Sequence, residues 1–241
     1  MARFFLEVAY KGTAYSGFQS QENARTIQEE IEKAFQVLQR DAVVLTGSSR
    51  TDAGVHARQN YFHFDFDHPL HEQFLYKINA ILPGDIVIKS VREVESSAHC
   101  RFDARYRRYR YYTYTTKDPF WEDRAWYFPY RLNHDLLQEA ALLLLTYQDF
   151  TSFSKRNTQV KTFICQLSDS QWILEGGSLI YQVQSNRFLR GMVRALVSTM
   201  LLVGREKLTL SQFKEIIECR DCTKASFAAP AHGLFLEEVG F

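Results

Sequence analysis

Two periods of apolar and polar residues recur along this chain and predict its strands and helices. Residues 59–66 end with a phenylalanine at every second position, which is typical of a strand with one buried face. After Thr26 the apolar residues repeat with helical spacing, and Glu29 stands where it would complete a capping box with Thr26. The buried stripe expected for this helix is Ile27, Ile31, Ala34 and Leu38.

The first part of the chain is predicted to follow the order strand, helix, strand, strand, helix, strand. This is the split βαβ order of ferredoxin-like folds. The expected strands are residues 4–10, 42–46, 59–66 and 85–91, and the expected helices start at Thr26 and span about 69–81.

The second part repeats this order loosely. Its expected strands are residues 106–115, 158–167, 171–174, 178–185 and 234–239, and its expected helices are residues 133–145, with Asn133 as cap, 188–203 and 209–218. No sequence repeat has a fixed spacing, so the duplication is one of topology. The prediction is an α+β fold of two ferredoxin-like, RRM-like halves, residues 1–103 and 104–241, with joined antiparallel sheets and a central cleft.

Composition places the chain among ordinary globular proteins. Of its 241 residues 46% are hydrophobic and 24% are charged, which suits one large domain or two small ones. No apolar run approaches the roughly 18 residues of a membrane span, so no membrane partner is expected. The first residues pass directly into an expected strand, without a signal or transit peptide, so we expect a cytoplasmic location.

The net charge of +1 gives no overall sign of nucleic-acid binding, but basic residues gather locally with aromatic ones. Arginines contact phosphates and aromatic rings stack on bases, so this mixture favours RNA as the partner. A solvated strand or helix face is the alternative explanation. The candidate RNA-binding residues are Arg105, Arg107, Arg108 and Arg110, interleaved with tyrosines, and Arg187 and Arg190 in a second group.

Four cysteines are present, and Cys219 and Cys222 form a single C-x-x-C spacing. A structural zinc site needs a second pair of ligands at matching spacing, and the sequence shows none. A thioredoxin-like redox pair would stand at the start of a helix, whereas this pair follows the end of an expected one. We therefore expect reduced, structural thiols and no metal.

The segment Arg50-Thr51-Asp52-Ala53-Gly54 lies between two strand-like runs. A loop of this kind holds a carboxylate at a sheet edge beside a built-in counter-ion. An acid that stays ionised there can act as a nucleophile or as an electrostatic stabiliser. Taken alone, the segment is also compatible with a turn whose aspartate caps its own backbone.

The longer string S-R-T-D-A-G-V-H-A-R-Q, which starts at Ser49, resembles the active-site loop of TruA-type tRNA pseudouridine synthases, usually written G-R-T-D-A-G-V-H-A-x-x-Q. Further pieces of that family's pattern follow in order through the chain. They are Y-K-G-T-A-Y-S-G-F-Q from Tyr10, R-T-I-Q from Arg25, R-Y-R-Y from Arg108, D-F-T-S-F from Asp149, F-L-R-G-M-V-R from Phe188, V-G-R from Val203 and A-P-A-H-G-L from Ala229. The chain departs from the pattern at Ser49 and at Phe18, where the family more often has glycine and tryptophan.

This resemblance implies an isomerase that breaks the bond from ribose C1′ to uracil N1 and joins C1′ to uracil C5. The implied substrate is uridine at positions 38 to 40 of the tRNA anticodon stem–loop. The reaction is redox-neutral and has no external leaving group, so no cofactor is expected. The family also implies a homodimer in which one tRNA touches both subunits, and an active site in the cleft.

The resemblance assigns Asp52 as the catalytic carboxylate and Arg194, from the family's M-V-R motif, as its counter-ion. Arg187, directly before the helix expected over residues 188–203, and Arg190 and Arg194 within it recur at i, i+3 and i+7, on the side opposite its apolar stripe.

Two further residues are assigned to the substrate. Tyr109 is expected to stack on the target uracil, which would offset part of the cost of extruding it from a helix. Arg50 is expected to occupy the space of the flipped nucleotide or to contact its phosphate.

Two other functions remain to be weighed against this one. A non-catalytic RNA-binding module would suit ferredoxin-like halves with exposed aromatics, but the R-G-F/Y-G-F pattern is absent and binding needs no acid in a turn. A zinc nucleobase deaminase would need H-x-E upstream and a proline before the first cysteine of the pair. The residue before Cys219 is Glu218, so we discard the deaminase and keep the RNA-binding module as the alternative.

Overall fold

The computed structural model describes residues 1–156 and 160–241, which form two compact units. Unit 1 comprises Met1–Arg105 with Phe235–Phe241, and unit 2 comprises Tyr106–Leu234. Both units combine helices with mainly antiparallel strands, so the predicted α+β class is confirmed. The division into halves 1–103 and 104–241 stays a prediction. In the part of the chain described, no helix is both long and apolar enough to span a membrane.

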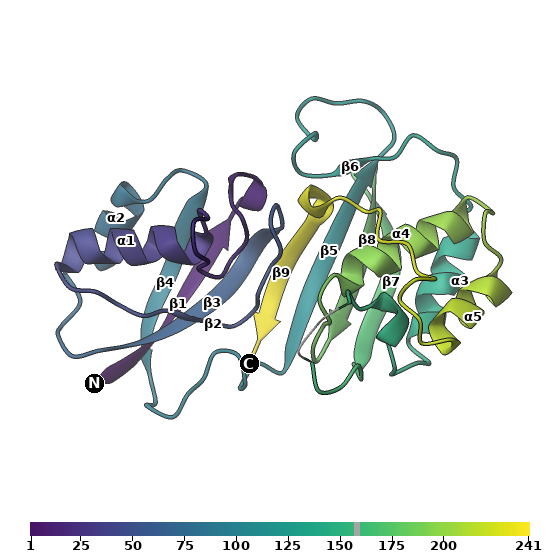
Figure 1. Cartoon of the computed structure of the whole chain (residues 1–241). Helices are drawn as coiled ribbons and strands as arrows, with labels where there is room; N and C mark the ends of the chain where they lie inside the picture. The colour runs from purple at the N-terminus through teal and green to yellow at the C-terminus, as the bar shows by residue number, and fades with distance from the viewer. Residues whose placement is uncertain (157–159) are drawn as a thin grey trace. The chain divides into compact units, whose positions relative to one another are not determined.

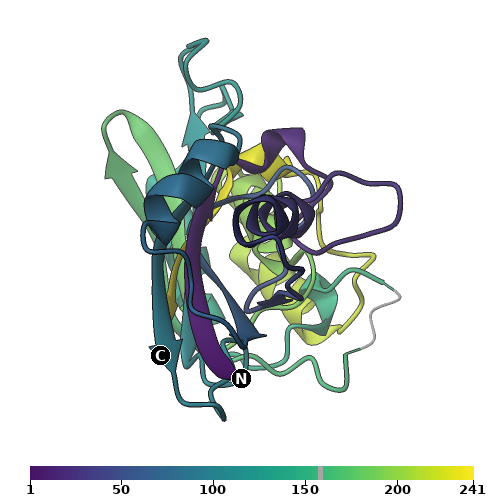
Figure 2. The same cartoon turned by 90° about the vertical axis from the view of Figure 1, so that its left-hand side faces the viewer.

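Unit 1 contains the strands β1 (Ala2–Tyr10), β2 (Thr46–Gly47), β3 (His56–Phe66), β4 (Ile86–Val94) and β9 (Leu234–Gly240), and the helices α1 (Ile27–Gln39) and α2 (Phe74–Ile81). β1 lies between β4 and β3 and is antiparallel to both (Figure 1). β3 also pairs with β2 in the antiparallel and with β9 in the parallel direction. Figure 2 shows α1 along its axis, beside one face of these strands.

The core of unit 1 is an aromatic cluster around Phe35 of α1. The Phe35 ring packs edge-on against Phe64 and Phe66 of β3 and against Phe74 of α2, at centroid distances of 5.3, 5.1 and 5.7 Å. Phe35 is fully buried, whereas Leu38, which the helical stripe predicts to be buried, is half-buried. The helix is therefore turned slightly toward Phe35, because the larger ring fills the space between the strands and α2.

The predicted helix starts agree with the capping residues. The Thr26 hydroxyl accepts a hydrogen bond of 3.3 Å from the backbone N–H of Glu29, and Asn133 and Thr209 cap their helices in the same way. At Thr26 the other half of the expected capping box is replaced by an ion pair, because the Glu29 carboxylate lies 2.7 Å from Lys33 Nζ.

The strand predicted over residues 42–46 is wrong except at its end, where β2 begins. The Leu45 backbone is instead hydrogen-bonded by side chains of α1. Its N–H donates to Glu32 Oε1 at 3.0 Å, and its carbonyl accepts from Gln28 Nε2 at 2.9 Å. These two side chains take the place of a partner strand. The helix predicted from about residue 69 is also shorter than expected, since α2 begins at Phe74.

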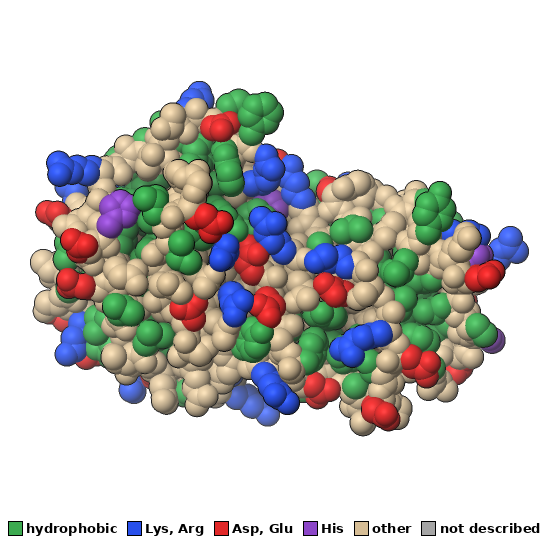
Figure 3. Space-filling view, turned by 180° about the vertical axis from the view of Figure 1, so that it is seen from behind, with side chains coloured by type: hydrophobic (Ala, Val, Ile, Leu, Met, Phe, Trp, Pro, Cys, Tyr) green, Lys and Arg blue, Asp and Glu red, His purple; other side chains and the backbone are tan. Residues whose placement is uncertain are grey.

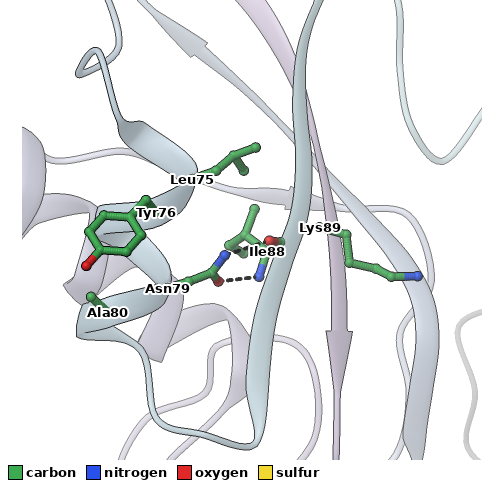
Figure 4. Close-up of a pocket in the computed structure, with 6 residues that line it drawn as sticks. All are labelled: Leu75, Tyr76, Asn79, Ala80, Ile88 and Lys89. Carbon is green, nitrogen blue, oxygen red and sulfur yellow. Dashed lines mark hydrogen bonds between the residues drawn. The ribbon is translucent and has the colours of Figure 1, made fainter.

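β4 forms one edge of the strand order in unit 1, and Asn79 of α2 covers part of that edge (Figure 4). Asn79 Nδ2 donates to the Ile88 carbonyl and Asn79 Oδ1 accepts from the Ile88 N–H, both at 2.8 Å. The amide side chain thus occupies the position of a neighbouring strand and hinders edge-to-edge pairing there. A shallow pocket beside it is lined by Leu75, Tyr76, Asn79, Ala80, Ile88 and Lys89.

Unit 2 contains the strands β5 (Tyr106–Tyr114), β6 (Trp126–Tyr127), β7 (Leu167–Glu175) and β8 (Ser178–Ser185), and the helices α3 (His134–Leu144), α4 (Met192–Gly204) and α5 (Leu210–Glu218). β8 lies between β5 and β7 and is antiparallel to both, and β6 is parallel to the end of β5. The strand predicted over 158–167 falls partly on residues 157–159, which lie outside the described residues. Before β7, residues 160–166 form only an isolated bridge between Ile164 and Asp149.

Helix α4 begins at Met192 rather than at residue 188, and nearly its whole circumference is buried. Gly191 precedes it in the left-handed conformation, with φ 74°, and the Met192 N–H donates to the Leu189 carbonyl at 3.1 Å. Arg187 and Arg190 therefore precede the helix. The predicted row of three arginines along one helix face is wrong, because the left-handed glycine interrupts the helical backbone before Arg194 is reached.

Replacing Phe35 by alanine should lower the free energy of unfolding by about 3–5 kcal/mol, because it leaves a cavity among three aromatic rings. Val37→Ala is the control on the same helix, since Val37 is 66% exposed, and should change the free energy by less than about 0.5 kcal/mol. Denaturant unfolding of both variants measures the difference. Equal effects would contradict a core organised around Phe35.

Candidate active site

The Asp52 loop, residues 48–55, connects β2 to β3 in unit 1. Its tip is a turn closed by a hydrogen bond of 3.2 Å from the Val55 N–H to the Asp52 carbonyl. Gly54 supplies the positive φ, 79°, that the third position of a type II turn requires. Asp52 is half-buried at the first position of this turn, and Arg50 is exposed two residues earlier.

Buried polar side chains hold this loop from the side of the strands. The Tyr10 and Thr51 hydroxyls share a hydrogen bond of 2.8 Å, and Asn60 Nδ2 donates to the Ser49 carbonyl at 2.8 Å. Ser49 and Thr51 are buried, whereas Asp52 immediately after them is half-buried. The side chains of the strands therefore hold the loop on its buried side, while the Asp52 carboxylate stays accessible to solvent.

The segment that follows β1 passes so close to the loop that side chains do not fit. A Cβ on Gly12 would lie 2.0 Å from the Val55 carbonyl oxygen, and the Gly12 N–H donates to His56 Nδ1 at 3.1 Å. Gly17 has φ 114°, and a Cβ there would lie 3.1 Å from the Thr51 carbonyl oxygen. The sequence prediction of the site missed this support. The sequence feature that could have indicated it is the pair Gly12 and Gly17, which lie among aromatic residues.

Tyr109 is buried on β5 of unit 2, with its ring edge-on to Phe188 at 5.0 Å. Because successive side chains of a strand point to opposite faces, Tyr109 shares its face with Arg107 and not with Arg108 or Arg110.

The opposite face of β5 carries arginines that are held by glutamines of β8. Arg108 donates two hydrogen bonds to Gln184 Oε1, at 2.7 and 3.1 Å, and Arg110 donates one of 2.8 Å to Gln182 Oε1. The structure therefore places Arg107 near the surface around Tyr109 and separates Arg108 and Arg110 from it.

Arg194 is half-buried on α4 and is fixed by the segment that starts at Ala229. Its Nε donates to the Ala229 carbonyl at 2.6 Å, and the Tyr111 hydroxyl donates to the Pro230 carbonyl at 2.9 Å. Burial raises the pKa of Tyr111, while the positive charge of Arg194 acts in the opposite direction. The A-P-A-H-G-L motif thus anchors the arginine that the sequence assigns to the site. Arg194 belongs to unit 2 and Asp52 to unit 1, so their ion pair stays a prediction.

The C-x-x-C cysteines lie at and after the end of α5, as predicted from the sequence. Cys219 is exposed, and Cys222 is half-exposed. Within residues 1–156 and 160–241, no three His, Cys, Asp or Glu side chains are placed to hold a metal ion together.

Charged side chains of both signs are mixed on the face seen in Figure 3. Lysine and arginine side chains there alternate with acidic ones over short distances. The mixture of signs on this face is in keeping with the net charge of +1.

Comparison with known proteins identifies the class to which this fold and loop belong. A sequence model of the family described as tRNA pseudouridine synthase matches residues 7–103 and 140–241. The matched residues include the whole Asp52 loop, the glycines that support it, and Arg194. The chain therefore belongs to the tRNA pseudouridine synthase family, which confirms the resemblance seen in its sequence.

Curated relatives with the name tRNA pseudouridine synthase A are similar to the chain along its whole length. Those of Parabacteroides distasonis and Porphyromonas gingivalis are 42% and 44% identical over 100% and 99% of this chain and 96% and 97% of their own. One from Staphylococcus aureus is 37% identical over 98% of this chain and 91% of its own. A solved structure, described as an unknown protein from Galdieria sulphuraria, aligns with 86% of this chain and 92% of its own length. Its sequence identity is 11% and its TM-score is 0.24.

Gly12→Ala should destabilise the chain by about 1–3 kcal/mol and reduce its isomerase activity, because the added methyl displaces the Val55 carbonyl and with it the Asp52 turn. Gly84→Ala is the matched control, since nothing lies within 4 Å of a Cβ there. Denaturant unfolding and the rate of pseudouridine formation in tRNA measure the two effects. An active Gly12→Ala enzyme would show that the close approach of this segment is dispensable.

Proposed function

We propose that this chain isomerises uridine to pseudouridine in tRNA with Asp52 as the catalytic carboxylate. The observation that carries this assignment is the hydrogen-bonded turn, which holds a half-buried carboxylate above buried hydrogen-bonding groups. Membership of the tRNA pseudouridine synthase family supports the reaction and the substrate. A rigid support is what a reacting group needs, because misplacement by about 1 Å can cost roughly a hundredfold in rate.

The reaction moves one bond within the substrate. The bond from C1′ to N1 breaks, the uracil turns while it is held, and C1′ bonds to C5. The C5 proton then leaves for solvent or a nearby base, and N1 takes up a proton. Asp52 acts at the junction of ribose and base, where it attacks the base, attacks C1′ or removes a ribose proton. The proton lost from C5 is balanced by the one gained at N1 and all electrons stay in the nucleotide, so the chemistry calls for no redox partner.

Three residues are proposed to act around the target nucleotide. Tyr109 stacks on the uracil, which contributes about 1–3 kcal/mol for such contacts. Arg50, exposed on the Asp52 loop, contacts the phosphate of the extruded nucleotide or fills its place in the helix. Arg194, which Ala229 already orients, acts as counter-ion to Asp52 and favours its ionised form.

The proposed RNA-binding residues divide by the faces on which they lie. Arg107 shares its strand face with Tyr109, and Arg105, Arg187 and Arg190 lie in segments next to these strands and α4. We assign these four to phosphates near the target nucleotide. Arg108 and Arg110 face the other side of β5, so any phosphates that they contact belong to another part of the tRNA.

The finer features expected from the sequence stay proposals. We propose ferredoxin-like halves with joined sheets and a central cleft, and the order β4-β1-β3-β2 in unit 1 supports the first of these halves. Modification at positions 38 to 40 of the anticodon stem–loop, a homodimer and a cytoplasmic location are proposed from the family resemblance and the sequence.

Asp52→Asn should lower pseudouridine formation by roughly 10³-fold or more while tRNA affinity stays nearly unchanged, because phosphate and stacking contacts supply the affinity. Release of tritium from C5-labelled uridine in tRNA measures turnover, and filter binding measures affinity. Asp41→Asn, at an exposed position after α1, is the control and should be fully active. An active Asp52→Asn enzyme would remove Asp52 from the mechanism.

Arg107→Ala should weaken the binding of all tRNAs alike and reduce the slope of log affinity against log salt concentration by about one, because one phosphate contact is lost. Arg107→Lys keeps the charge and should keep the slope. Filter binding across a salt series compares the variants with the wild type. An unchanged slope in Arg107→Ala would exclude Arg107 from the RNA contacts.

A further inference from the structure

A buried hydrogen-bond network lies beneath the Asp52 loop, and its centre is the side chain of Asn60. Asn60 is 0% exposed. Its Nδ2 donates to the Ser49 carbonyl at 2.8 Å and to the Tyr10 hydroxyl at 3.2 Å, and its Oδ1 accepts from the Tyr61 N–H at 2.9 Å. Every polar atom of this buried amide has a partner, as a stable buried network requires.

The network reaches the residue next to Asp52 through two hydroxyls. Tyr10, which accepts from Asn60, shares a hydrogen bond of 2.8 Å with Thr51 Oγ1. Tyr10 and Thr51 are 5% and 8% exposed, so water hardly competes for these bonds. Ser49 and Thr51 are thereby hydrogen-bonded to side chains of β3 and β1. The backbone that leads to Asp52 is held at these two residues.

An irregularity in the strand pairing accompanies this network. Val8 of β1 pairs with Asn60, but Tyr10 pairs with Ala57, so β3 carries an extra residue between them. Such bulges redirect side chains and are frequent beside active sites. Here the bulge lies between the Val8–Asn60 pair and the Tyr10–Ala57 pair, and each pair contains one residue of the network.

We propose that Tyr10, Thr51 and Asn60 are positioning residues for catalysis, which fix the turn so that the Asp52 carboxylate meets the ribose–base junction. This inference rests on the proposed role of Asp52. All three side chains are buried beneath the loop, so their effect on the reaction passes through the geometry of the loop. A catalytic group must be held within about 0.5 Å of its productive position, which a surface loop without such ties does not achieve.

Tyr10→Phe and Thr51→Val test the proposal, because each removes one hydroxyl with little change of shape, whereas a variant of the fully buried Asn60 risks unfolding. Each should lower kcat by about tenfold and leave KM for tRNA within about twofold. Thr51→Ser restores the hydroxyl and should recover most of kcat. The double variant should lose little more than Tyr10→Phe alone, because that variant already breaks the Tyr10–Thr51 bond, together with the Asn60–Tyr10 bond.

Tyr181→Phe is the matched control for the loss of a buried hydroxyl bond. The Tyr181 and Ser170 hydroxyls share a hydrogen bond of 2.8 Å between β8 and β7 in unit 2, and both residues are buried. Its midpoint of thermal unfolding should fall about as much as that of Tyr10→Phe, while kcat stays within about twofold of the wild type. A kcat loss shared by Tyr181→Phe would mean that general destabilisation causes it.

Tritium release at a temperature well below unfolding, run together with Asp52→Asn, separates this proposal from the assignment of Asp52. Normal kcat in folded Tyr10→Phe and Thr51→Val beside an inactive Asp52→Asn would overturn the positioning role and leave the catalytic assignment standing. Full activity of Asp52→Asn would overturn both. A raised KM with unchanged kcat would also overturn the proposal, because it would assign the network to tRNA binding.

Discussion

A loop that presents a reactive carboxylate has to pair its own backbone polar groups on the side away from the substrate. In this chain Asn60 Nδ2 donates to the Ser49 carbonyl, the Ser48 N–H donates to the Tyr61 carbonyl at 2.8 Å, and the Phe18 N–H donates to the Thr51 carbonyl at 3.2 Å. Unpaired groups at this depth would cost about 1–3 kcal/mol each. The aromatic and glycine-rich segment after β1 and the R-T-D-A-G-V-H loop are therefore parts of one structure, although about forty residues separate them.

The strand that follows the loop is stiff because both of its faces are covered. Phe62 and Phe64 lie on the face toward α1, while Tyr61 and His63, which the alternating pattern predicts to be on the polar face, are buried as well. His63 Nδ1 lies 3.2 Å from Cys100 Sγ, and burial lowers the pKa of His63 to about 4, so the imidazole is neutral near pH 7. The Asp52 loop is therefore attached to a strand that is packed on both faces.

The elements that the sequence predicted well are those defined by local patterns, such as helix caps and alternating apolar residues. Asn133 and Thr209 cap helices where they were expected, and the phenylalanines before Phe66 lie in a strand. The misplaced elements depend on distant partners. Residues near Leu45 are not a strand, because α1 side chains bind the Leu45 backbone, and no local pattern contains that information. Within the candidate site, sequence motifs pointed to Asp52. The buried amide of Asn60 beneath the loop was not predicted, because it is recognised by its contacts in the fold.

Strand geometry also limits what a motif can say about binding. Arg107, Arg108, Tyr109 and Arg110 are consecutive in the sequence and form a single basic, aromatic group by composition. The pleat of β5 divides them, since Tyr109 and Arg107 point to one face while Arg108 and Arg110 pair with glutamines on the other. A ligand that stacks on Tyr109 cannot contact all of these arginines at one place. The basic group therefore provides two separate sets of positive charge, and of these arginines only Arg107 shares a strand face with Tyr109.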